Sequence, residues 1–370
     1  MKKLMIPALF LVIFACGNSD SSRTDPEDLS AETEAPMLHV TAEIGIELGD
    51  SNFVFGVIQD VDFTQDGNIA ILDTQKKKVR LFSPSGSFLG EFGGEGEAPG
   101  EFLNPQGIAC LRDGRIAVTD PFSREVEIFS SDLLHSETVS NFTTRAPFVI
   151  SAAGNGFAGE QGGFNRDAGT VTTSVALWET NTDSAFIFFE LEDDFSPENM
   201  VDRIMQPSAG LMADLDNLYY STPVSQDYAV SVYPMDGSEP YYLTFPDYEP
   251  VIKSEEDIQD DILAYEYRMQ AMASSGRGSR LAGAGYEPPP HYYATGSIGA
   301  DSNGNVWVQR GWEPNPTFDL FSAGETVPFE TVIVDPELDL SGFTFTITPN
   351  GIAAFDSNPD DYPKVLVLSF

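Results

Sequence analysis

Residues 57–92 read VIQDVDFTQDGNIAILDTQKKKVRLFSPSGSFLGEF, and residues 105–140 read PQGIACLRDGRIAVTDPFSREVEIFSSDLLHSETVS. The two stretches share one pattern: residues 66–73 (DGNIAILD) align without a gap with residues 113–120 (DGRIAVTD). Each unit has an apolar run, an Asp-Gly turn, a second apolar run that ends in Asp, a polar loop and an alternating third run. Asp-Gly supplies the positive φ angles that tight hairpins need. The pattern therefore predicts a repeated unit of four antiparallel strands.

The turn before the second strand can be followed through the rest of the chain. It recurs near residues 154–158, 216–220, 303–308 and 350–356, which gives six units with those at Gly67 and Gly114. Four strands in a unit of about 40–45 residues are typical of a propeller blade. The sequence therefore predicts an all-β fold, a six-bladed β-propeller over residues 39–370 with four antiparallel strands per blade.

The last unit lacks a fourth strand, because only three strands fit before Phe370, near residues 341–348, 351–356 and 364–370. Residues 39–48 (HVTAEIGIEL) precede the first unit and alternate like a strand. Closing the ring would hide two sheet edges that otherwise aggregate. We therefore predict that this N-terminal strand completes the sixth blade.

Residues 93–105 (GGEGEAPGEFLNP), followed by Gly107-Ile108-Ala109, resemble the segment between blades in NHL repeats. The chain thus resembles the NHL-repeat-like six-bladed β-propeller lipoproteins, most closely over residues 57–130. Some NHL-type propellers are metal-dependent lyases, and related propellers are lactonases with calcium in the central channel. The resemblance therefore raises the possibility of a divalent cation held by Asp73, Asp120 and Asp356, which end second strands. The alternative is that these aspartates accept loop N–H groups within each blade.

The N-terminus, MKKLMIPALFLVIFAC, joins two lysines to an apolar run that is too short to span a membrane. Its end, Ile13-Phe14-Ala15-Cys16, resembles the lipobox of bacterial lipoproteins. The resemblance implies a signal peptide over residues 1–15 and a lipidated Cys16. Residues 16–38, rich in Ser, Asp, Glu, Thr and Pro, are predicted to be a disordered tether. We expect an extracytoplasmic protein anchored by lipid to the cell envelope.

The formal net charge of -39 comes from 58 acidic and 19 basic side chains. Such a surface repels phosphate backbones and anionic lipid. We therefore expect no nucleic-acid partner, and contact with the membrane through the lipid anchor only.

Residues 247–293 interrupt the blade period. Within them, Ile258, Ile262, Tyr265 and Met269 recur at helical spacing and predict one short helical insertion with a single apolar face. The segment that follows brings together arginines and tyrosines suited to a partner-binding surface: Arg277, Arg280, Tyr286, Tyr292 and Tyr293. The alternative is a decoration packed on the blade edges.

Motifs of hydrolases, P-loop proteins and zinc peptidases are missing from the sequence, and its three histidines lie far apart. These observations favour a non-enzymatic module, with no catalytic residues and no cofactor, that binds a protein or a small molecule. The alternative is a metal-dependent lyase or lactonase that uses the central channel. Convergence of inward His, Asp, Asn and Glu side chains would favour that alternative.

Overall fold

The structure is a computed structural model that describes residues 35–140, 142, 145–165, 167–180, 185–207, 209–222, 227–274, 281, 284–311, 315–340, 342–357, 359 and 361–370. These residues all belong to one compact unit, residues 35–370. The predicted signal peptide, Cys16 and residues 17–34 lie outside the described residues, as do Arg277 and Arg280.

The first blade is a sheet of four consecutive antiparallel strands: β2 (Ile58–Phe63), β3 (Ile69–Asp73), β4 (Lys78–Phe82) and β5 (Phe88–Gly93). The first hairpin turns at the predicted Gly67, which has φ of 76°, and the third hairpin turns at Gly86, which has φ of 81°. A side chain at either position would strain the backbone. All five residues of β3 are buried, because other strands and blades surround this strand on every side.

Three further sheets repeat this strand order along the chain. The second blade contains β6 (Gly107–Cys110), β7 (Ile116–Asp120), β8 (Glu125–Phe129) and β9 (His135–Val139). The third contains β10 (Ile150–Ala153), β11 (Gly156–Asn165), β12 (Thr170–Glu179) and β13 (Ala185–Asp194). The fourth contains β14 (Gly210–Ala213), β15 (Asn217–Ser221), β16 (Ala229–Pro234) and β17 (Tyr241–Thr244).

The fifth and sixth blades form one eight-stranded sheet, because β1 (Met37–Ile44) lies between them. The fifth contains β18 (Thr295–Ala300), β19 (Val306–Arg310), β20 (Thr317–Phe321) and β21 (Glu330–Val334), and the sixth contains β22 (Thr344–Thr348), β23 (Gly351–Phe355) and β24 (Val365–Ser369). β1 pairs antiparallel with β24 and, at its first two residues, parallel with β21. The predicted closure by an N-terminal strand is confirmed. The strand ends at Ile44 rather than at residue 48, because Gly45 follows with φ of 143°.

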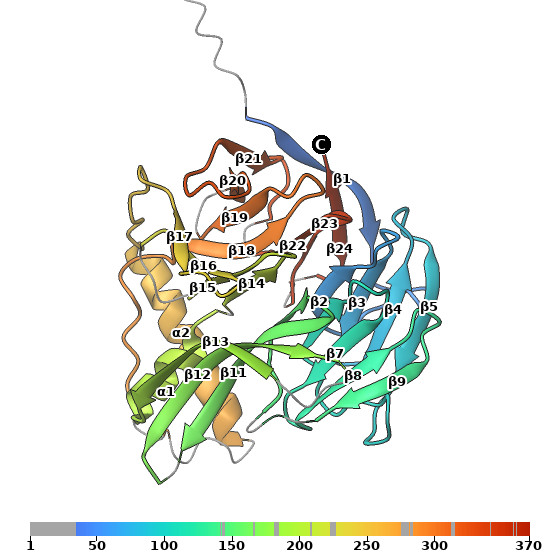
Figure 1. Cartoon of the computed structure of the whole chain (residues 1–370), viewed down its shortest axis with the longest axis horizontal. Coiled ribbons are helices and arrows are strands. Elements are labelled where there is room, and N and C mark those ends of the chain that lie inside the picture. The colour runs from blue at the N-terminus through green and yellow to red at the C-terminus, as the bar shows by residue number, and fades with distance from the viewer. Residues whose placement is uncertain are drawn as a thin grey trace, which may run out of the picture. The chain divides into compact units, whose positions relative to one another are not determined.

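The six first strands line the centre of a ring (Figure 1). Each contacts the next in the order β2, β6, β10, β14, β18 and β22, and β22 returns to β2. The apolar core lies between blades: Ala70 and Leu72 of the first blade pack with Ile116 and Val118 of the second. The predicted six-bladed propeller is therefore confirmed.

Two helices interrupt the strands, although the sequence predicted one. α2 (Glu255–Ser274) is the predicted helical insertion, and α1 (Pro197–Met205) lies between the third and fourth blades. Ser196 caps the N-terminus of α1 because its Oγ accepts the N–H of Asn199, and Pro197 lies in the first turn. Neither helix combines the length and the apolar character needed to cross a membrane, and no other helix occurs among the described residues.

Candidate functional site

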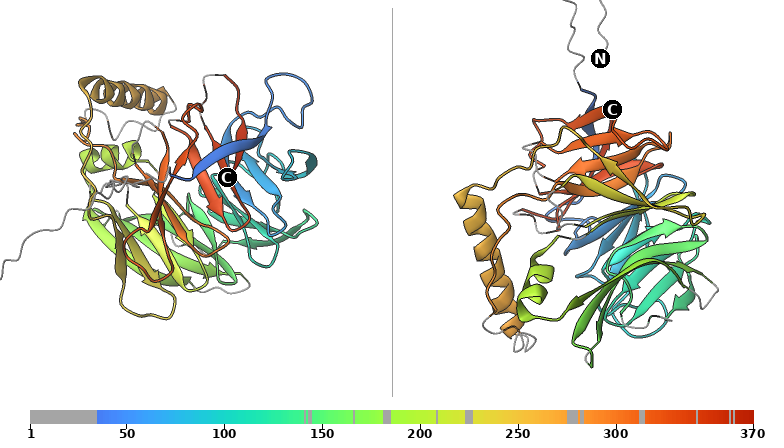
Figure 2. Two further views of the ribbon diagram at one scale, coloured as in Figure 1. Left: turned by 90° about the horizontal axis from the view of Figure 1, so that it is seen from above. Right: turned by 60° about the vertical axis from the view of Figure 1, so that its left-hand side comes forward.

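Both helices and the longest hairpin lie on the same face of the ring. Because the strands of a blade are antiparallel, this face carries the start of each first strand and the end of each second strand. It therefore receives the connections between blades, which contain α1 and α2 (Figures 1 and 2). It also receives the β11–β12 hairpin, whose strands have 10 residues each against 5 in β3 and β4. We call it the helix-bearing face.

Side-chain contacts connect these irregular parts to one another. Arg203 of α1 donates to Thr173 Oγ1 of β12 (2.7 Å) and pairs with Asp193 of β13 (3.0 Å). Arg268 of α2 donates to the carbonyl oxygen of Ile204 in α1. The lengthened hairpin, α1 and α2 thus form one assembly on the rim of the propeller.

The three predicted tyrosines lie beside α2 and are half-buried. The Tyr286 ring lies 5.5 Å from the Tyr265 ring, and Lys253 Nζ lies 5.5 Å from the Tyr292 ring centre and 6.0 Å from that of Tyr293. Burial, with the nearby Asp261 carboxylate, raises the pKa of Tyr286 to about 12. The structure therefore brings these tyrosines together and leaves them partly accessible, and their role in partner binding stays a prediction.

The predicted apolar face of α2 is only half-covered, and no side chain of the helix is fully buried. The opposite side exposes a second apolar pair at i, i+4 spacing, Leu263 (53 % exposed) and Tyr267 (76 % exposed). This pair was missed at the sequence level, although its spacing was visible there. α2 therefore presents apolar side chains both to the part of the molecule that it packs against and, on its other side, to solvent.

An aromatic cluster lies on the same face at the second and third blades. The exposed rings of Phe122 and Phe148 lie 5.9 Å apart, edge to face, and the Arg145 guanidinium lies 5.0 Å from the Phe122 centre. Thr119 Oγ1 donates to the Pro147 carbonyl oxygen (2.6 Å), and Gln161 donates to that of Arg145 (2.8 Å). Hydrogen bonds thus fix residues 145–148 while both rings remain exposed.

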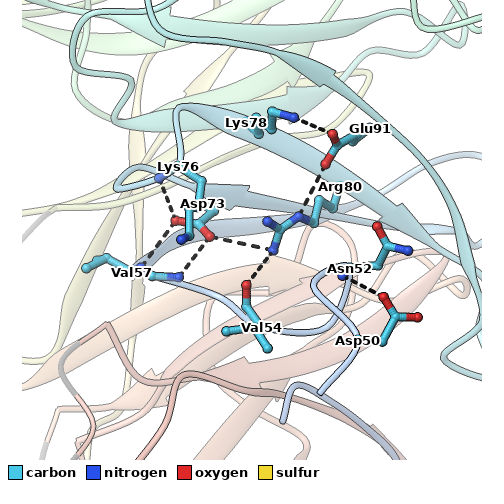
Figure 3. Close-up of polar contacts among 10 residues, drawn as sticks. Asp50, Asn52, Val54, Val57, Asp73, Lys76, Lys78, Arg80 and Glu91 are labelled. Atoms are coloured by element: carbon cyan, nitrogen blue, oxygen red, sulfur yellow. Dashed lines mark hydrogen bonds and ion pairs between the residues drawn. The ribbon is translucent and has the colours of Figure 1, made fainter. Parts of the chain in front are cut away.

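Asp73, one of the three predicted metal ligands, is fully buried and accepts backbone N–H groups (Figure 3). Its carboxylate accepts from Gly56 (2.9 Å), Val57 (3.2 Å) and Lys76 (3.0 Å). Arg80 Nη1 lies 3.7 Å from the same carboxylate. Asp73 therefore fixes the segment entering the first blade to the end of its second strand.

Asp120 has the same role in the second blade, where it accepts from Leu103 (2.8 Å), Asn104 (2.7 Å) and Ser123 (3.2 Å). Asp356 is partly exposed after β23. Among the described residues, no group of three or more His, Cys, Asp and Glu could hold a metal ion, so these three aspartates are not assembled into a calcium site. Asp73 and Asp120 thus accept backbone N–H groups within their own blades, and a metal-binding role for the three aspartates stays a prediction.

The fifth blade carries the first blade's ion pair with its charges exchanged. β19 ends in Arg310 where β3 ends in Asp73, and Asp319 occupies on β20 the register position of Arg80 on β4. Arg310 forms a bidentate ion pair with the buried Asp319: Nε donates to Oδ2 (3.0 Å) and Nη2 donates to Oδ1 (2.9 Å). The sequence pattern of an Asp at the end of each second strand does not indicate this pair, because β19 ends in Arg310.

Polar groups of the first strands link neighbouring blades at the centre of the ring. Asp60 accepts the N–H of Ile108 (2.9 Å), and Asp62 accepts the N–H of Cys110 (2.7 Å). Burial raises the pKa of Asp60 to about 7 and that of Asp62 to about 6. The junction between the first two blades thus depends on two carboxyl groups that are costly to ionise there.

The opposite face of the ring has a small pocket of about 150 Å³, lined by Leu111, Arg112, Asp113, Gly154 and Asn155. Arg112 follows β6 and donates to the carbonyl oxygen of Ala213 at the end of β14 (3.3 Å). Gln65, which follows β2, donates to the carbonyl oxygen of Arg112. Arg112 therefore links three blades across the hairpin ends of the first strands.

A family model and one solved structure agree with this architecture. A crystal structure from Bacteroides fragilis, described as that of an exported protein, is 13 % identical with a TM-score of 0.51, over 90 % of this chain and 95 % of that one. Virginiamycin B lyase from Staphylococcus aureus is 9 % identical with a TM-score of 0.47, over 90 % of this chain and 99 % of that one. No curated protein matches the chain in sequence. The model of the family described as 6-bladed beta-propeller matches residues 46–266, and the chain belongs to this family.

Proposed function

We propose that this chain is a lipid-anchored, extracytoplasmic β-propeller that binds a protein or a small-molecule ligand on its helix-bearing face. One observation carries the proposal: the parts that depart from the blade repeat gather on one face and contact one another. Irregular segments on a rigid scaffold are where binding sites concentrate.

The exposed side chains of this face support a binding role. Leu263 and Tyr267 on α2, and Phe122 and Phe148 at the second and third blades, expose apolar surface to water. Aromatic side chains with limited rotational freedom are favoured at contact surfaces. The lyase or lactonase alternative requires several metal ligands converging on one axis. Among the described residues, no group of three or more His, Cys, Asp and Glu side chains is placed to hold a metal ion.

The double variant Leu263→Ser/Tyr267→Ser tests the location of the binding surface. Both positions are exposed, so we expect the free energy of unfolding to change by less than about 1 kcal/mol. We expect the purified variant to capture less of the partner from an envelope extract than the unmodified chain does, as measured by quantitative mass spectrometry. Its matched control is Leu89→Ser/Tyr242→Ser, which removes two similarly exposed side chains from the outer strands β5 and β17. Equal capture by both variants would place the site elsewhere.

Lipid anchoring rests on the sequence Ile13-Phe14-Ala15-Cys16 and is tested separately. Two or three acyl chains hold a protein stably on a bilayer. We therefore expect the unmodified protein in the membrane fraction with an acylated N-terminal Cys16, and the Cys16→Ser form in the soluble fraction. Fractionation followed by mass spectrometry of the N-terminal peptide is the measurement. An unacylated and soluble wild-type protein would refute the anchor.

A further inference from the structure

The third blade ends in an unusually long open edge strand. β13 has 10 residues, whereas the outer strands β5, β9 and β17 have 6, 5 and 4. In its sheet β13 pairs with β12 alone. Among the described residues, Asn199 Nδ2 donates to the carbonyl oxygen of Asp194 (3.1 Å), at the end of the strand, and no described strand pairs with the outer edge. Most of the outer row of backbone N–H and C=O groups is therefore available to another strand.

The side chains of the first half of β13, residues 185–189, carry no charge that would protect this edge. Phe186, Ile187 and Leu191 are 54, 54 and 52 % exposed. The strand, AFIFFELEDD, contains neither Lys nor Pro, the residues that commonly prevent pairing at an edge. Exposed apolar side chains beside unpaired backbone groups favour the addition of a strand from another molecule.

Charge divides β13 into two halves and defines the chemistry of its partner. Residues 185–189 are uncharged, and residues 190–194 carry four acids, of which Asp193 pairs with Arg203. Glu190, Glu192 and Asp194 have no ion-pair partner among the described residues. A second copy of a chain with net charge -39 would be repelled, whereas a cationic segment would be attracted.

We propose that β13 is a docking edge for an extended segment of a partner protein that carries Lys or Arg residues followed, toward its C-terminus, by apolar β-branched residues. Antiparallel pairing, the more stable arrangement, places the basic half opposite residues 190–194 and the apolar half opposite residues 185–189. This surface involves neither Leu263 nor Tyr267. The docking proposal is therefore tested independently of the proposed ligand site on α2.

Two synthetic peptides of identical composition test the orientation. One has Lys, Lys and Arg alternating with Thr, followed by a Val- and Ile-rich half, and the other has the reversed order. Binding to the full-length protein is measured by fluorescence anisotropy at about 0.15 M salt. We expect the basic-first peptide to bind at least about tenfold more tightly. Equal affinities would overturn the proposal, because general attraction to an acidic surface would explain them. Failure of both peptides to bind, or tighter binding of the reversed peptide, would also overturn it.

Two variants test the strand itself. Ile187→Lys places a cation on the edge, and we expect at least about a tenfold loss of affinity for the basic-first peptide. Tyr242→Lys makes the same charge change on the outer strand β17, at a similarly exposed position, and we expect affinity to be retained. Hydrogen exchange should show peptide-dependent protection of backbone amides within residues 185–194. Equal losses in the two variants, or protection elsewhere only, would reject β13 as the docking edge.

Discussion

Removal of residues 17–44 is expected to abolish cooperative folding of the propeller, whereas removal of residues 17–34 is expected to leave its melting temperature unchanged. β1 contributes the completely buried side chains of Leu38 and Ile44. Truncation of such a residue to Ala costs about 2–5 kcal/mol, and total stabilities are only about 5–15 kcal/mol. Loss of the strand also uncovers β24 and the end of β21, two edges that favour aggregation.

Thermal melts followed by circular dichroism, together with light scattering, measure both truncations. A deletion that ends at residue 38 should already be destabilising, because it removes Leu38 and the Pro36 carbonyl oxygen that accepts the N–H of Ile333 (3.0 Å). His39→Ala is the control within the strand. Its exposed side chain bonds only Asp335 among the described residues, so we expect a change within about 0.5 kcal/mol. If the form lacking residues 17–44 melted like the intact chain, the closure by β1 would contribute nothing.

The parts of the fold that local sequence controls were predictable. Asp66-Gly67 and Asp113-Gly114 indicate hairpins because a positive φ is a property of single residues. All six second-strand turns were found, and the missing fourth strand of the last blade led to the N-terminal strand. The boundary before β1 was less accurate, since the polar composition of the tether extends close to Met37 and the strand begins within that region.

Features that no local sequence pattern reveals were not predictable. The Arg310–Asp319 pair replaces the Asp–Arg pair of the first blade, and only the strand register reveals their equivalence. α1 had a readable start at Ser196-Pro197, but its nine residues were too few for a helical period to stand out. The open edge of β13 was also hidden, because sequence alone does not show which strands remain uncovered.

The contacts of Asp60 and Asp62 with the second blade also could not be predicted from a local sequence pattern. They make the stability of the propeller depend on pH. Burial raises the pKa of Asp60 to about 7 and the pKa of Asp62 to about 6, from the ordinary value of 3.8 for an aspartate. A carboxyl with a raised pKa in the folded state binds its proton more tightly there than in the unfolded chain. Its stabilising contribution is therefore fully present below about pH 4 and is lost as the pH rises through 6 and 7. Burial also raises the pKa of the neighbouring Cys110 thiol, which stays protonated over this range.

The variant Asp60→Asn/Asp62→Asn should consequently be more stable than the unmodified chain at pH 8. The amide oxygens can still accept the N–H groups of Ile108 and Cys110, and the amides never become charged. Their NH2 groups replace the oxygens that accept the N–H groups of Val61 (2.9 Å) and Phe63 (2.7 Å), and the loss of these two hydrogen bonds offsets part of the gain. Raising the pKa of Asp60 from 3.8 to about 7 corresponds to ~4 kcal/mol of lost stability at pH 8. We expect the double variant to recover about half of that, because the Asp60 side chain keeps partial contact with water. Urea unfolding at pH 5 and pH 8 measures the effect. Asp66→Asn, an exposed change in the first Asp-Gly turn, measures the effect of removing one negative charge from an acidic protein, and twice this effect corrects for the two charges lost in the double variant. The difference between pH 5 and pH 8 should shrink in the double variant and persist in the control; equal pH dependence in both would mean that the two buried carboxyls do not control this junction.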